Sequence, residues 1–132
     1  MFQYFVFVLL AGIILATFLP HLFIHTASPI DKKNIIACKA IGQTHSVIIT
    51  NSGFNPQILK AQACDKVIFI NRGNVYHQVA FGDHPTHLIY PGFNERAMPV
   101  GDKNEVILTA LGTYKIHDHI YEELEGSLII SK

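Results

Sequence analysis

The sequence lacks net charge, because its ten basic and ten acidic side chains balance and are mixed along the chain. This balance removes the electrostatic case for nucleic-acid binding, which depends on a basic patch or stripe. Internal repeats and low-complexity tracts are also absent from the 132 residues. A chain of this length without repeats predicts one domain.

Cysteine is scarce: only Cys38 and Cys64 are present, 26 residues apart. This spacing fits no C-x-x-C or zinc-finger pattern, and neither residue lies in the histidine-rich half of the chain. A Cys-His nucleophile is therefore not indicated, and no Ser-His-Asp arrangement stands out. Two interpretations of the pair remain open, a disulfide formed in an oxidising compartment or two buried free thiols.

Charged residues are missing from the first 24 positions, and the 20 residues from Phe5 to Ile24 are almost entirely apolar. About 20 apolar residues suffice to span a bilayer. A cleaved secretion signal would carry a basic start and an A-x-A-like cleavage site, and both are lacking here. We therefore favour an uncleaved membrane anchor over a cleaved signal. The positive-inside rule, applied to Lys32 and Lys33, argues against export of the part of the chain after the anchor. The character of that domain nevertheless favours its export.

A helical period of 3.6 residues is lacking after this segment, although Tyr121–Glu125 has room for one helical turn. The apolar runs are 4 to 7 residues long, rich in β-branched and aromatic residues, and bounded by Gly, Pro, Asn or Asp. This spacing predicts an all-β sandwich or barrel. The predicted strands are 34–40, 46–50, 67–70, 77–81, 105–110, 114–117 and 127–130. We divide the chain into an anchor or signal helix (1–25), a linker and leading strand (26–43) and a β domain (44–132).

Histidine is the residue in excess, with eight in the chain. Five occur between positions 77 and 119 and are the candidate metal ligands: His77, His84, His87, His117 and His119. In an extended segment His117 and His119 point to the same side, and Pro85 stiffens the His84–His87 turn. Imidazole without thiolate favours Cu(II) or Zn(II), and the donor types alone leave both ions open. His45 is interpreted as a structural or surface residue.

Three further residues are candidates for supporting such a site. A carboxylate that accepts the far N–H of a ligating histidine fixes the tautomer of the ring. Asp83 and Asp118 are the candidates for this role, and Tyr90 is either a hydrogen-bonding partner or a core residue. The acidic cluster Glu122, Glu123 and Glu125 is interpreted as a solvated turn.

Several motifs together resemble the cupredoxin domain of blue-copper proteins. They are Phe54-Asn55-Pro56, the run Cys64 to Asn71, His77, Gly112-Thr113-Tyr114 and the closing run Gly126 to Ile130. The resemblance implies a Greek-key β-sandwich, held outside the membrane, that binds copper. Blue-copper members carry Cys, His and Met ligands after the G-T-Y strand, where this chain has Asp118, Tyr121 and Leu124. Without the thiolate a blue-copper centre is not expected.

A subgroup of cupredoxin-like proteins is more similar, because it shares H-P-T-H followed by Tyr (His84 to His87, then Tyr90) and H-D-H (His117 to His119). We therefore expect the metal near the Asp83–His87 turn. Together with the apolar N-terminal segment, the resemblance predicts a membrane-tethered protein on the periplasmic or extracellular face, or a secreted one if that segment is cleaved. Its expected role is copper binding or delivery, or slow electron relay to a membrane redox or copper-handling partner. Two alternatives remain: a copper-dependent oxidoreductase with an open coordination position, and a metal-free β-sandwich interaction module. An enzyme is the less favoured class.

Overall fold

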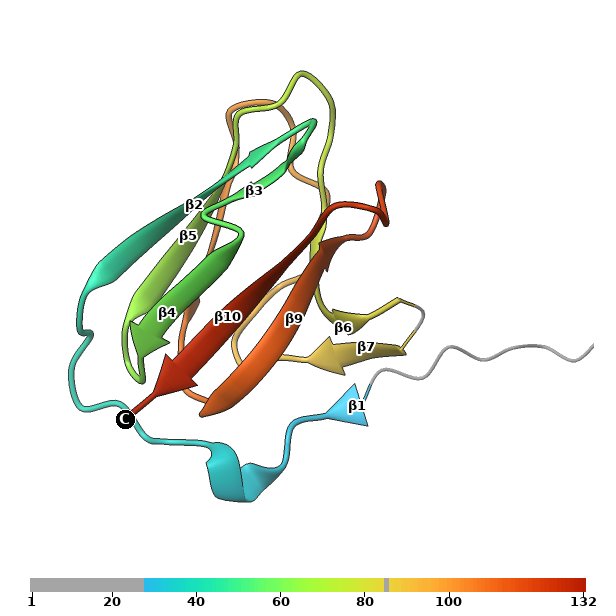
Figure 1. The fold of residues 1–132 in the computed structure, drawn as a ribbon. Helices are drawn as coiled ribbons and strands as arrows, with labels where there is room; N and C mark the ends of the chain where they lie inside the picture. Colours follow the sequence, from blue (N-terminus) through green and yellow to red (C-terminus); the bar gives the residue numbers. More distant parts are fainter. Residues whose placement is uncertain (1–27, 85) are drawn as a thin grey trace, which may run out of the picture.

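Two β-sheets pack face to face in the computed structural model, which describes residues 28–84 and 86–132 (Figure 1). The six-stranded sheet has the order β1 (Ser28–Pro29), β7 (Thr86–Ile89), β6 (Val79–Asp83), β9 (Gly112–Asp118), β10 (Glu125–Ser131) and β4 (Ile58–Gln62). The four-stranded sheet has the order β3 (Gly53–Asn55), β2 (Thr44–Thr50), β5 (Lys66–Asn71) and β8 (Lys103–Ile107). The predicted all-β sandwich is confirmed.

Alternation of buried and exposed side chains explains why these segments form strands. In β10, Gly126, Leu128 and Ile130 are buried while the residues between them are not. The same period of two occurs in β5, where Val67 and Phe69 are fully buried. One face of each strand therefore contributes to the apolar layer between the sheets, as expected for a sandwich with solvent outside.

The strand predicted over 34–40 is wrong. The structure has a 3₁₀ helix at Lys32–Asn34, followed by a single bridge between Ile35 and Ala110. Apolar residues in this stretch suggested a strand, but the segment runs along the edge of the sandwich and makes too few ladder bonds to form one. The turn at residues 121–124 closes through one bond from Leu124 N to Tyr121 O rather than through a helix.

The disulfide between Cys38 and Cys64 is present, so that interpretation is confirmed over two free thiols. It fixes the irregular leading segment to the turn between β4 and β5. The predicted anchor over 1–25 lies outside the described residues. Within the part of the chain that the structure describes, no helix is long and apolar enough to cross a membrane.

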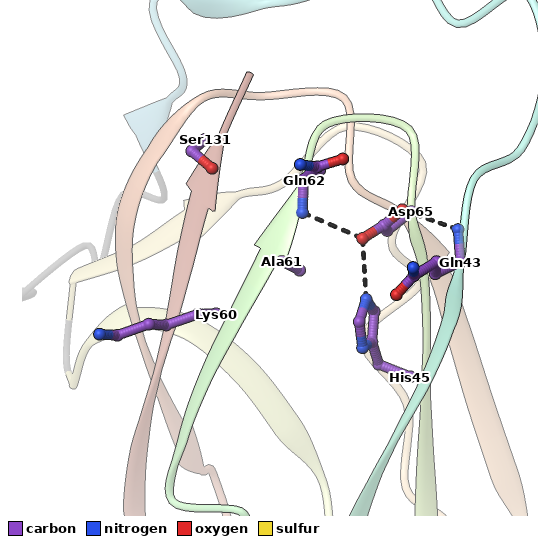
Figure 2. A pocket seen from close by; sticks show the side chains of 7 residues that line it. All are labelled: Gln43, His45, Lys60, Ala61, Gln62, Asp65 and Ser131. Atoms are coloured by element: carbon purple, nitrogen blue, oxygen red, sulfur yellow. Dashed lines mark hydrogen bonds and ion pairs between the residues drawn. The ribbon is translucent and has the colours of Figure 1, made fainter.

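A buried carboxylate joins β2 to the same β4–β5 turn (Figure 2). Asp65 accepts hydrogen bonds from Gln43 N at 2.8 Å, from Gln62 N at 3.0 Å and from His45 Nε2 at 2.8 Å. These donors line a small polar pocket together with Lys60. The hydrogen bond from His45, followed by that from Gln62, lowers the pKa of Asp65 below its ordinary value of 3.8.

Replacing Asp65 with asparagine is expected to destabilise the fold at neutral pH. The lowered pKa means that the folded state binds this proton less tightly than the unfolded state does. The stabilisation by the carboxylate is therefore complete above about pH 5 and is lost as the pH falls through the lowered pKa. Urea unfolding of the wild type and Asp65→Asn should show a gap in unfolding free energy at pH 7 that narrows toward about pH 2. A gap that stays constant with pH would contradict this role of the charge.

Candidate metal centre

The register of three strands brings histidines to the outer face of the six-stranded sheet. Tyr114, Ile116 and Asp118 of β9 are buried on the core side, so His117 points to the opposite side. His117 lies opposite Ala80 of β6. Ala80 is fully buried yet is not part of the core cluster between the sheets, and residues directly opposite each other in a sheet share one face, so Ala80 and His117 lie on the outer face together.

The same face receives a second histidine from β7. His87 lies opposite Gly82 of β6, one position before Leu88, which packs against the core. His84 occupies the turn between β6 and β7. His119 follows β9 and continues its pairing through a bond from its backbone N to Gln78 O at 2.7 Å. Strand pairing thus brings together four imidazoles from two chain segments, 84–87 and 117–119.

Three of these rings form a group suited to a metal ion: ligand atoms of His84, His87 and His119 all lie within 4.8 Å of one another. None of the three is fully buried. The ring centroid of His119 lies 4.7 Å from that of His87 and 5.2 Å from that of His84. Because metal to imidazole nitrogen distances are about 2.0–2.1 Å, a small closure of the rings would bring these nitrogens onto one ion.

The ring of His117 lies beside this group. Its ring centroid lies 4.9 Å from that of His87 and 5.7 Å from that of His84. Its Nδ1 lies 2.9 Å from Gly82 O, and a carbonyl only accepts, so Nδ1 carries the proton and Nε2 holds the lone pair. Burial, first of all, lowers the pKa of His117 below 6.5. Its Nε2 is buried with no hydrogen-bond partner, as expected for a neutral ring prepared for a metal.

Two glutamates pair with the rings of this group. Glu95 Oε2 lies 3.2 Å from His87 Nδ1, and Glu122 Oε1 lies 3.4 Å from His84 Nε2. Carboxylates in such positions orient ligating histidines. The Glu122 side chain is 60% exposed in a turn, as predicted, but its contact with His84 is not indicated by the sequence. Glu95 gives no signal because it stands eight residues after His87 in an irregular connection.

His77 lies apart from this group, in the buried region between the sheets. Its Nδ1 pairs with Asp118 Oδ2, and both side chains are almost completely excluded from solvent. The ring of Tyr121 lies 5.6 Å from the His77 ring. On the other side, a Cβ added to Gly73 would fall 2.6 Å from His77 Nε2, so backbone packs against that nitrogen. Like His117 Nε2, His77 Nε2 is buried without a hydrogen-bond partner.

The remaining predicted supporting residues have other partners. Asp83 pairs with Lys115 Nζ at 2.9 Å, and the bond from Lys115 lowers the pKa of Asp83. Tyr90 is buried, its hydroxyl accepts from Ala110 N at 3.2 Å, and burial raises its pKa to about 12. Its ring stacks on Phe81, so Tyr90 belongs to the core.

No protein-family model matches the chain, and no curated protein does. Solved structures do match. A purple cupredoxin from Nitrosopumilus maritimus is 21% identical, with a TM-score of 0.58 over 65% of this chain and 98% of that one. The chain has the cupredoxin fold. A reduced Cu(I) form of an amicyanin variant is 22% identical, with a TM-score of 0.56 over 73% of this chain and 86% of that one. A second amicyanin variant, also Cu(I), is 21% identical, with a TM-score of 0.55 over 80% and 94%.

The cupredoxin fold thus carries a histidine group here that could hold a metal. Its rings lie on the outer face of the β1–β7–β6–β9–β10–β4 sheet rather than between the sheets. The described residues contain no free cysteine. The donors are therefore all nitrogen, with carboxylates behind two of them.

Proposed function

We propose that this cupredoxin-fold chain binds one copper ion, as Cu(II), through His84, His87, His117 and His119. The observation that carries the proposal is the convergence of His84, His87 and His119 beside the His117 ring, whose Nε2 atom is buried and unpaired. An orphaned buried nitrogen is costly unless a partner arrives. A metal ion is the partner that would satisfy it and the neighbouring rings together.

Copper is favoured over other divalent ions by the donor set. Imidazole nitrogen suits Cu(II) and Zn(II), and Cu(II) stands at the top of the affinity order for first-row divalent metals. The amicyanin structures of the same fold are described as Cu(I) forms, which supports copper as the ion. Zinc is the competing occupant.

The proposed role is copper binding and delivery, or slow electron relay, on the outer side of a membrane. A centre without thiolate lacks the tuned copper–sulfur bond of blue-copper sites, so rapid electron relay is not part of the proposal. The disulfide supports an oxidising compartment. The apolar segment Phe5–Ile24 supports a membrane tether, and a membrane redox or copper-handling protein would then be the partner.

Titration of the full-length chain with Cu(II), followed by metal analysis and absorption spectroscopy, tests this function. We expect one saturable site with weak ligand-field absorption and four nitrogen couplings in electron paramagnetic resonance. Failure to bind Cu(II) saturably would overturn the proposal and favour a metal-free interaction module. A spectrum that changes on addition of nitrite or oxygen would indicate an exchangeable position, and hence the oxidoreductase alternative.

A further inference from the structure

One carboxylate beside the histidine group is more sheltered than the other. The side chains of His87 and Glu95 are 17% and 28% exposed, whereas those of His84 and Glu122 are 31% and 60% exposed. Shelter from solvent reduces screening, so a charge at Glu95 acts on the group more strongly than one at Glu122. Of the two carboxylates, Glu95 therefore has the stronger electrostatic effect on the histidine group.

The chain before Glu95 is fixed by the core. Phe93 packs edge-on against Phe69, with ring centroids 5.8 Å apart, and against Phe81 at 5.1 Å. Phe81 belongs to β6, the strand beneath the histidines. Phe93 therefore packs the backbone before Glu95 against β6, the strand that pairs with the strands of His87 and His117.

The residues on either side of Glu95 are also held by the four-stranded sheet. Asn94 O accepts a bond from Asn104 Nδ2 of β8 at 2.8 Å. Arg96 pairs with Asp102, and its Nη2 donates to the carbonyl of the first residue of β8 at 2.7 Å. Glu95 is therefore anchored on both sides and does not sit on a freely moving loop.

We propose that Glu95 is a positioning residue that makes the site hold Cu(II) in preference to Cu(I). The inference rests on the proposed copper site. By accepting the Nδ1 proton of His87, Glu95 leaves Nε2 of that ring for the ion. An imidazole that ligates a metal is neutral, so the carboxylate is a negative charge close behind a ligand. Cu(II) carries one more unit of charge than Cu(I), and the carboxylate stabilises it more.

The test compares Cu(II) and Cu(I) affinities of the full-length chain, purified in detergent, by competition with a chelator for each ion. Glu95→Gln keeps the shape and removes the charge. We expect its Cu(II) affinity to fall about tenfold more than its Cu(I) affinity, which corresponds to a rise of about 59 mV in the one-electron reduction potential. Glu95→Asp keeps the charge and should retain most of the preference.

Glu105→Gln is the matched control, because Glu105 lies in β8 and pairs with Lys66; its affinity ratio should equal that of the wild type. An equal loss of both ions in Glu95→Gln, or an unchanged ratio, would overturn the inference while leaving the proposed copper site standing. If the glutamine variant unfolds, a Glu95→Asp ratio equal to that of the wild type supports the inference, and a tenfold shift overturns it. A wild type that binds neither ion would overturn the proposed function itself.

Discussion

The double variant His87→Ala, His119→Ala is expected to lose the Cu(II) site. These two rings are 4.7 Å apart and come from the two chain segments that form the group. Removing both leaves one ring from each segment, and we expect the dissociation constant to rise more than about a thousandfold, since ligand bonds supply most of the binding free energy of such sites. Isothermal titration with Cu(II) measures the loss directly.

His45→Gln is the matched control for this experiment. It removes an imidazole that pairs with Asp65 in the β4–β5 turn and does not belong to the histidine group. It should bind Cu(II) as the wild type does. Metal-free melting of the double variant should stay close to that of the wild type, since its rings lie outside the core. Stoichiometric binding that is retained in the double variant would show that the ion binds through other residues.

Replacing Asp118 with alanine is expected to destabilise the metal-free fold by about 3 kcal/mol, because it leaves the buried Nδ1 of His77 without its hydrogen-bond partner. His77 Nδ1 would lose its only partner in the described structure. Asp118 Oδ1 also accepts from Gln78 N at 3.2 Å and from Ile120 N at 2.9 Å, so the segment that leads to His119 would loosen as well. Urea unfolding in the presence of a chelator measures the change.

Asp118→Asn separates the charge from the backbone contacts. The amide oxygen still accepts from the backbone N–H groups, so we expect a loss of no more than about half that of the alanine variant. A loss below about 1 kcal/mol in Asp118→Ala would contradict the view that this pair is an internal support. A Cu(II)-induced gain in stability that is larger in Asp118→Ala than in the wild type would instead indicate that His77 takes part in metal binding.

Much of the fold was predictable because it depends on local patterns. Short apolar runs between turn residues indicated the sandwich, and the period of two put His117 and His119 on one side. The segment β7 was not predicted because its four residues lie inside a long connection rich in Pro and Gly. β4 was missed because Ile58, at its start, is 59% exposed and obscures the alternation.

The site was predictable only in part, because only some of its contacts depend on local sequence patterns. The H-P-T-H and H-D-H motifs name residues within a few positions of each other, and local geometry constrains them. The pairing of His77 with Asp118 and of His87 with Glu95 depends on strand register and on the path of a loop anchored in two sheets. Such contacts are set by tertiary packing, which a sequence pattern of this kind does not encode.

The edge strand β1 has a consequence for where the metal is presented. Ser28 pairs with Leu88 of β7, the neighbour of His87, and adjacent strands lie about 4.8 Å apart. The polypeptide before Ser28 therefore joins the domain beside the histidine group. If the proposed tether holds this end of the domain, the histidine group therefore lies on the tethered side of the sandwich.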